Sequence, residues 1–460
     1  MLFAVSLTVL LAACSGGGSN ASGDPNSASA ASAASNPSGM SRMALLGQQM
    51  FLDTALSESG NQSCETCHDS AYAFAGNPTN DSNTAAGVAM GGPTTAHTLQ
   101  GLRNSPALTY TIFAPAFFFD TDATPTGGFF RDGRASTLAD QAAGPFTNPF
   151  EMANASNDAV LAKLKTRPYY NEFLAVFGAG AATDGDTAMK NMALAIQQYE
   201  KEEPLFKQFN SKYDAYLAGK AQLTTQELNG LAIFNNPAKG NCMSCHVSAP
   251  TAATPALFTD FTYDNIGVPR NWAINANQNP YPYTGVTGYP DANGKALDAN
   301  GDDYYDLGLC GPLRTDLATH TGLCGAFRVP SLRNIALTAP YFHNGYAKTL
   351  EEAVAFYITR DSDPNRWYRD ASGNPDAPYN DLPEIYKSNV NKEEVPYIPS
   401  LAPTLTASEM SDLVHFLCTL TDGYDPANPA AYNVPQQCNS TAATMQATLD
   451  GAATGTAANP

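Results

Sequence analysis

Two short stretches, Cys64-Glu-Thr-Cys67-His68 and Cys242-Met-Ser-Cys245-His246, decide the fold class of this chain of 460 residues. In each, two cysteines stand three positions apart and a histidine follows the second directly. Two thioether bonds to one haem require two cysteines on one turn, and the next residue can then place an imidazole on the iron. A redox dithiol or half of a zinc site would explain one such cysteine pair, but not two pairs that both continue with histidine. The sequence therefore predicts two covalently bound c-type haems.

A weaker repeat precedes the two motifs. Gly47-Gln-Gln-Met-Phe51 lies before the first motif and Gly230-Leu-Ala-Ile-Phe234 lies before the second. Each predicts a short helix that leads to a haem-attachment loop. Because the two units are far apart in the chain, we expect two haem domains rather than one domain with two haems. We predict an N-terminal haem domain over residues 41–204 and a C-terminal haem domain over residues 205–424.

The rest of the chain shows helical periodicity separated by long irregular stretches. Thr349 and Ser408 are expected helix N-caps, because acidic residues follow each of them in the first turn. The segments with a helical period are 158–177, 188–201, 225–234, 350–359 and 408–420, whereas 76–106, 260–328 and 360–401 are rich in Gly, Pro, Asn and Asp and have no period. The fold is therefore predicted to be mainly α, with two cytochrome c-like haem domains, long irregular loops and no extended sheet.

The two ends of the chain differ in composition from the middle. Residues 1–14 are an apolar stretch that ends in Leu-Ala-Ala-Cys14, which is typical of a bacterial lipoprotein signal peptide and is too short to span a bilayer. We expect Cys14 to carry a lipid anchor to the membrane, in the periplasm or cell envelope; the alternative is an ordinary signal peptide without lipid. Residues 15–40 are predicted to be a flexible tether and residues 425–460 a low-complexity tail.

The remaining cysteines predict disulfides. Of nine cysteines, one is Cys14 and four belong to the haem motifs. An exported chain favours disulfides, and local pairing of the other four gives Cys310 with Cys324 and Cys418 with Cys438.

The charge of the chain limits its partners. The formal net charge is −19, which argues against nucleic acid, because nucleic-acid binding requires basic patches. An acidic surface can steer a basic redox partner at low ionic strength, or it can serve solubility alone.

The ligand on the second face of each haem iron is not determined by composition. Methionine is the usual ligand in cytochrome c, and four histidines lie outside the haem motifs: His97, His320, His343 and His415. These alternatives stay open at this point.

Several motifs resemble the bacterial di-haem cytochrome c peroxidase and MauG family. They are Arg328-Val-Pro-Ser-Leu-Arg-Asn334, Pro340-Tyr-Phe-His343-Asn-Gly and Arg131-Asp-Gly-Arg134. The resemblance runs from about residue 41 to residue 424 and includes both haem motifs in order. Two further stretches, Ser211-Lys-Tyr-Asp-Ala-Tyr-Leu-Ala-Gly219 and Gly308-Leu-Cys-Gly-Pro312, resemble the MauG-like subgroup.

The resemblance implies roles around the first haem. His68 would bind the iron of the haem that reacts with peroxide, and Gln141, Pro145 and Glu151 would lie on its other face. A carboxyl group can move the proton that peroxide must shift between its oxygen atoms, and an amide can donate a hydrogen bond to oxygen. Pro145 offers no ligand and would leave that side of the iron open. The alternative for these three residues is a role in capping or turns.

At the second haem, the resemblance implies His246 as one iron ligand and Tyr357 as the other. Plain peroxidases have methionine at the position of Tyr357. A thioether is a soft ligand that favours ferrous iron, whereas a phenolate is hard and anionic and favours higher oxidation states. The change therefore suits a haem that stores an oxidising equivalent.

The resemblance also implies one calcium ion between the haems. Asn104, Thr338 and Pro340 match its ligands, the last two through backbone carbonyl oxygens, and such oxygen ligands suit a hard cation. His343, next to that site, is expected to be structural.

Two positions depart from the family pattern. The family usually has tryptophan between the haems, directly before Asp-Gly-Arg, and this chain has Arg131 there. Plain peroxidases also have a histidine that blocks the first iron until reduction, and this chain has Thr84 there, with His97 a poor substitute. The first haem is therefore expected to be open in the resting protein.

The predicted function is an oxidoreductase that uses hydrogen peroxide at the first haem and draws electrons through the second. The electrons would come from a small redox protein or from oxidisable side chains of a partner protein. One alternative is a non-enzymatic di-haem electron carrier with two six-coordinate haems and no reaction with peroxide. Another is a haem enzyme that cleaves an organic substrate with dioxygen and needs no peroxide.

Overall fold

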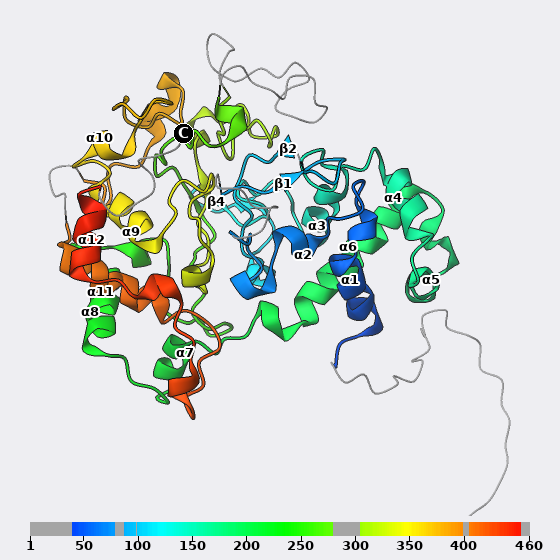
Figure 1. The fold of residues 1–460 in the computed structure, drawn as a ribbon, viewed down its shortest axis with the longest axis horizontal. Coiled ribbons are helices and arrows are strands. Elements are labelled where there is room, and N and C mark those ends of the chain that lie inside the picture. Colours follow the sequence, from blue (N-terminus) through cyan, green and yellow to red (C-terminus); the bar gives the residue numbers. More distant parts are fainter. Residues whose placement is uncertain (1–38, 79–86, 98, 279–303, 399–403, 452–460) are drawn as a thin grey trace, which may run out of the picture. The chain divides into compact units, whose positions relative to one another are not determined.

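The computed structural model describes residues 39–78, 87–97, 99–278, 304–398 and 404–451 (Figure 1). The predicted signal peptide with Cys14, almost all of the predicted tether, and Thr84 lie outside the described residues. Within the described part of the chain, no helix is both long and apolar enough to cross a membrane.

The N-terminal half comprises the described residues up to 206. Its α-helices pack closely against one another. Figure 1 shows α1 (Arg42–Leu52) lying along α6 (Gly185–Glu202), the longest helix of this half. Gly47 permits the contact, because a Cβ atom on it would lie 1.9 Å from the main-chain oxygen of Ala195. The other helices are α2 (Cys64–Cys67), α3 (Leu138–Thr147), α4 (Asn157–Leu164) and α5 (Tyr170–Phe177).

The C-terminal half, from residue 207 onward, also has two helices that make close contact at a glycine. Here α8 (Thr225–Asn235) lies against α11 (Ala407–Cys418), and a Cβ atom on Gly230 would lie 2.0 Å from the main-chain oxygen of Asp412. Four residues after each of these glycines, Phe51 and Phe234 are buried. The sequence repeat therefore marks two equivalent helix crossings. The other helices are α7 (Lys212–Leu217), α9 (Leu350–Thr359), α10 (Pro364–Trp367) and α12 (Ala442–Leu449).

Within the described residues, the strands form short antiparallel pairs in the loops. β1 (Met90–Gly91) pairs with β2 (Leu99–Gln100), β3 (Phe118–Phe119) with β4 (Pro125–Thr126), and β5 (Tyr263–Asp264) with β6 (Phe327–Arg328). The prediction of a mainly α fold with long irregular loops is confirmed.

Each half has its own hydrophobic core. One cluster of buried side chains extends from Met40 to Phe206 and another from Tyr213 to Met445. Loops join the halves: Gly127 donates its main-chain N–H to Phe261, and the hydroxyl of Tyr110 donates to Asp422 at 2.6 Å. The chain from Met40 onward packs as one unit, so the division into domains at residue 204 stays a prediction.

The structure corrects three local predictions. The predicted helix 158–177 is two helices, α4 and α5, because Pro168 disfavours helical backbone at the residue before it. The N-cap of α11 is Thr406 rather than Ser408: its hydroxyl accepts from the N–H of Glu409, whose carboxylate accepts from the N–H of Thr406. Helix α3 was not predicted, since it carries Pro145 inside it.

The predicted disulfides are confirmed, and one of them changes the view of the C-terminus. Cys310 is bonded to Cys324, and Cys418 to Cys438. The second bond ties the predicted tail to the end of α11. Beyond it, α12 buries Met445, so residues 425–451 contain ordered structure and are not a loose tail.

Candidate functional site: two haem-attachment cavities

The first haem motif forms a short helix, and hydrogen bonds orient its haem-binding side chains. Ser63 caps α2, and the reciprocal hydrogen bonds of a capping box hold Ser63 to Thr66. Nδ1 of His68 lies 2.8 Å from the carbonyl oxygen of Phe74. That oxygen only accepts, so Nδ1 carries the proton and Nε2 keeps its lone pair. Burial lowers the pKa of His68, which keeps the imidazole neutral and able to bind a metal.

The first cavity fits a covalently bound haem. It has a volume of about 450 Å³, and Cys64, Cys67 and His68 all line it. Both thiols are free of disulfides, and burial raises the pKa of Cys67 to about 12 and that of Cys64 further. A haem would be held here by thioether bonds to the two cysteines and by the imidazole of His68.

The second motif repeats this arrangement in the C-terminal half. Nδ1 of His246 lies 2.9 Å from the carbonyl oxygen of Phe258, so Nδ1 again carries the proton. Cys242 and Cys245 are free of disulfides and line a cavity of about 280 Å³ together with His246. The thiols and the imidazole therefore fit a second haem.

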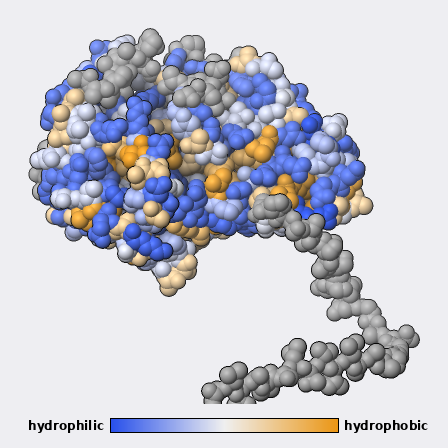
Figure 2. Space-filling view, turned by 60° about the horizontal axis from the view of Figure 1, so that its bottom comes forward, coloured by the Kyte–Doolittle hydropathy of each residue, from blue (hydrophilic) through white to orange (hydrophobic). Residues whose placement is uncertain are grey.

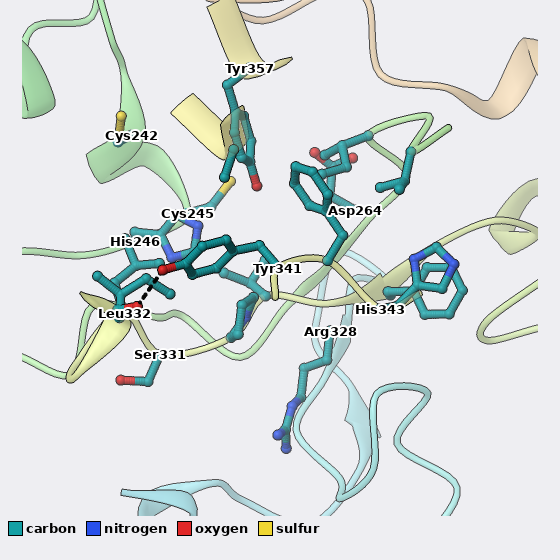
Figure 3. Close-up of a pocket in the computed structure, with 18 of the residues that line it drawn as sticks. Cys242, Cys245, His246, Asp264, Arg328, Ser331, Leu332, Tyr341, His343 and Tyr357 are labelled. Carbon is teal, nitrogen blue, oxygen red and sulfur yellow. Dashed lines mark hydrogen bonds between the residues drawn. The ribbon is translucent and has the colours of Figure 1, made fainter. Parts of the chain in front are cut away.

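Tyr357 lies in the second cavity, as predicted from the resemblance. Figure 3 shows its side chain pointing from α9 toward Cys245 and His246. Removal from water raises the pKa of Tyr357 well above its usual value, with the nearby Cys245 acting in the same direction. The ring of Tyr397 stacks on that of Tyr357, with centroids 6.0 Å apart, and the guanidinium of Arg360 lies 4.2 Å from the centroid of Tyr397. Nothing in the sequence pattern marked Tyr397.

The three residues predicted for the distal side of the first haem share one cavity. Gln141 and Pro145 come from α3, Glu151 comes from the loop after it, and all three line the first cavity with His68. The backbone of Glu151 is held beside β1, because the N–H of Gly92 donates to its carbonyl oxygen at 3.1 Å. Burial raises the pKa of Glu151 to about 7, while Arg134 opposes the shift.

A second acidic side chain lines the same cavity and was missed by the sequence analysis. Glu200 on α6 is 2% exposed, and its Oε2 has no hydrogen-bond partner among the described residues. Burial raises the pKa of Glu200 to about 8. The available signal was an acid on the buried face of a helix, four residues after Ile196.

A wall of polar residues lines both cavities. It includes Asn104, Arg131 and Arg328. In Figure 3, Arg328 extends away from the second haem motif toward loops of the N-terminal half, where it donates to the carbonyl oxygen of Gly128. Burial and the charges of Arg103 and Arg328 lower the pKa of Arg131 to about 9. Arg131 thus lines both cavities, at the position where the resemblance implies tryptophan.

The predicted calcium ligands are close together, but their hydrogen bonds do not suit a metal. Asn104, Thr338 and Pro340 line the second cavity. Nδ2 of Asn104 donates to the carbonyl oxygen of Pro340 at 2.5 Å, while Oδ1 of Asn104 accepts from Arg131 at 3.2 Å. Two of the three predicted donor oxygens are therefore engaged by hydrogen-bond donors. The calcium ion stays a prediction that these contacts do not support.

The four other histidines have local partners. Nε2 of His97 lies 2.8 Å from Asn61, and Nε2 of His415 lies 2.8 Å from the carbonyl oxygen of Ser440. His320 stacks on Phe119. His343 lines the second cavity, but its ring stacks on Phe327 with centroids 3.7 Å apart. These contacts favour structural roles over iron ligation.

Comparison with known proteins agrees with this geometry. A family model described as di-haem cytochrome c peroxidase matches residues 41–222. The methylamine utilization protein MauG of Paracoccus denitrificans is 36% identical over 84% of this chain and 90% of that protein. Cytochrome c551 peroxidase of Nitrosomonas europaea is 30% identical over 68% of this chain and 71% of that protein.

Solved structures give the same result. The di-haem peroxidase BthA of Burkholderia thailandensis is 38% identical with a TM-score of 0.71, over 83% of this chain and 86% of that one. With two haem motifs, two matching cavities and relatives along most of its length, the chain belongs to the di-haem cytochrome c peroxidase and MauG family of haem oxidoreductases.

Proposed function

We propose that hydrogen peroxide reacts in the first cavity and that the required electrons pass through the second. The observation that carries this proposal is Glu151, whose carboxyl group has a pKa of about 7 and lines the same cavity as His68. A carboxyl group with a pKa near neutrality can both accept and return a proton at the pH of the cell.

The residues of the first cavity supply the proton chemistry. Reduction of hydrogen peroxide to two water molecules consumes two electrons and two protons, and haem iron supplies the electron chemistry when bound. Glu151 accepts a proton from one peroxide oxygen and returns it to the other, which becomes the leaving water. The amide of Gln141 donates a hydrogen bond that orients the peroxide. Pro145 has neither an N–H group nor a side-chain ligand, so it leaves room for peroxide.

The residues of the second cavity suit storage of an oxidising equivalent. His246 and Tyr357 would be the two protein ligands there, and a phenolate favours ferric over ferrous iron because it is hard and anionic. The stacked ring of Tyr397 gives an oxidised centre an aromatic neighbour.

Two electron sources are compatible with this chemistry. A small redox protein would make the chain a peroxide-removing enzyme, and oxidisable side chains of a partner protein would make it a protein-modifying enzyme. The Tyr357–Tyr397 pair favours the second source, while Arg131 in place of the interhaem tryptophan removes one aromatic step between the haems.

We place the protein in the periplasm or cell envelope. Its two disulfides support an oxidising compartment. The lipid anchor at Cys14 rests on the sequence of residues 1–14 alone.

The test is the reaction of the haem-loaded protein with one equivalent of peroxide, followed optically in a stopped-flow instrument. We expect Glu151→Gln to react about a hundredfold more slowly than wild type, which is typical for loss of a general acid–base group. Glu172→Gln is the matched control, because Glu172 is a surface residue that pairs with Arg42. A wild-type protein that ignores peroxide would instead be an electron carrier, and dioxygen consumption without peroxide would indicate cleavage of an organic substrate.

A further inference from the structure

The polar wall that lines both cavities contains a positively charged side chain, that of Arg131. We propose that the guanidinium group of Arg131 takes the place that a calcium ion would hold there, so that this chain binds no calcium between its haems. The proposal rests on the contacts of Arg131 and on the charges around it, and it does not depend on the peroxide reaction.

The contacts of Arg131 fix Asn104 in an orientation that is wrong for a metal ligand. Nε of Arg131 donates to the main-chain oxygen of Asn104 at 3.0 Å, and Nη2 donates to Oδ1 at 3.2 Å. Nδ2 of Asn104 faces the oxygen of Pro340 at 2.5 Å. Turning the amide to offer Oδ1 to a metal beside Pro340 would bring its NH2 group against the guanidinium, so two donors would face each other.

The charges around Arg131 also oppose a divalent cation. Arg103 and Arg328 line the first cavity together with Arg131, so three guanidinium groups share this wall. The nearby carboxylates are already engaged, because Asp132 and Asp306 bind Arg103 at 2.8 and 2.5 Å. Within the described residues, no carboxylate forms an ion pair with Arg131 or Arg328. Asp306 lines the second cavity, but both of its oxygen atoms accept hydrogen bonds from Arg103, so it is not available as a calcium ligand.

A fixed guanidinium performs the electrostatic task of a metal in another way. Arg131 and Arg328 line both cavities. A haem carries two propionate groups, and guanidinium groups bind carboxylates well, so these two side chains would supply counter-charges to haems bound in the cavities. Unlike a metal ion, such a cation cannot be removed by a chelator.

The first test uses the unmodified haem-loaded protein. It is treated with EGTA, then with excess calcium chloride, and passed through a desalting column, and the calcium and iron in each sample are measured by mass spectrometry. We expect wild type to hold two iron atoms and no calcium above the buffer blank, with an EPR spectrum that neither treatment changes. A calcium ion retained in each chain, or an EPR change that EGTA causes and calcium reverses, would overturn the proposal.

Variants test whether the guanidinium itself excludes calcium. Arg131→Met removes the charge and the donors, and we expect it to retain about one calcium ion per chain and to change its EPR spectrum on EGTA treatment. Arg131→Lys keeps the charge and should stay free of calcium. Arg314→Met is the matched control, because Arg314 is a buried arginine paired with Asp316 outside both cavities. If Arg131→Met loads haem but binds no more calcium than Arg314→Met, the proposal is wrong.

Discussion

Glu151 and Glu200 are two carboxyl groups in one cavity, and burial shifts their pKa values in the same direction by different amounts. Arg134 opposes the shift at Glu151, whose pKa is about 7, while no such charge acts on Glu200, whose pKa is about 8. Burial therefore favours the protonated form of both groups, and Arg134 favours the carboxylate form at Glu151 alone. Glu151 is the better proton acceptor, and Glu200 is the better proton store.

This difference predicts the pH dependence of the peroxide reaction. The rate should fall as pH decreases through about 7, because protonated Glu151 cannot accept a proton from peroxide. The measurement is the second-order rate constant with peroxide across the pH range. Glu200→Gln should keep this acid limb, and Glu151→Gln should lose it. An acid limb that survives in Glu151→Gln would assign the proton transfer to another group.

The site residues differ in how far sequence could identify them. Gln141, Pro145 and Glu151 could be named because the resemblance to the family implies them, and the structure places all three in one cavity. Tyr397 lies in a stretch without periodicity, and only the fold brings it beside Tyr357. Arg131 was recognised as a departure from the family, but its bonds to Asn104 depend on loops that no local pattern specifies.

At the scale of elements, two glycines decide how closely the helices cross. Gly47 and Gly230 each face a main-chain oxygen at about 2 Å from a hypothetical Cβ atom. Backbone cannot yield as a flexible side chain can, so a methyl group there must push the helices apart. The repeat in the sequence predicted the two helices, but the reason for glycine is visible only in the crossings.

Gly47→Ala and Gly230→Ala should each destabilise the haem-loaded protein by about 2–3 kcal/mol, as overpacking of a close contact does. Urea unfolding followed by the haem absorption band measures this change. Gly180→Ala is the control, because no atom lies within 4 Å of its would-be Cβ atom. Equal midpoints for all three variants would show that the crossings can relax without loss.

Helix boundaries can be predicted where residues close in the sequence, such as a proline or a capping pair, determine them. The end of α4 follows from Pro168, and the capping box of α11 lies in the local pattern from Thr406 to Glu409, two residues before the predicted N-cap. Helix α3 could not be predicted in this way, because Pro145 inside it breaks the usual rule for helix interiors. Pro145 lines the first cavity, where peroxide is proposed to react.

For the whole molecule, the net charge of −19 shapes encounters with partners. In the view of Figure 2, hydrophobic residues form separate small groups among hydrophilic ones. Long-range attraction by this negative charge is therefore expected to favour association with a basic redox partner.

With a small basic cytochrome as electron donor, kcat/KM should fall by about tenfold or more when salt is raised, because salt screens charges beyond a Debye length. Steady-state oxidation of the donor at several ionic strengths measures this effect. An acidic donor of similar potential is the control and should show the opposite trend. A rate with the basic donor that does not depend on salt would mean that the acidic surface serves solubility alone.

The central claim, an open first haem beside a His246–Tyr357 haem, is tested most directly by EPR and visible spectra of the diferric protein before and after one equivalent of peroxide. The account predicts one high-spin and one low-spin ferric signal, both lost within seconds, and an altered low-spin signal in Tyr357→Phe. Two low-spin signals that do not respond to peroxide would contradict it.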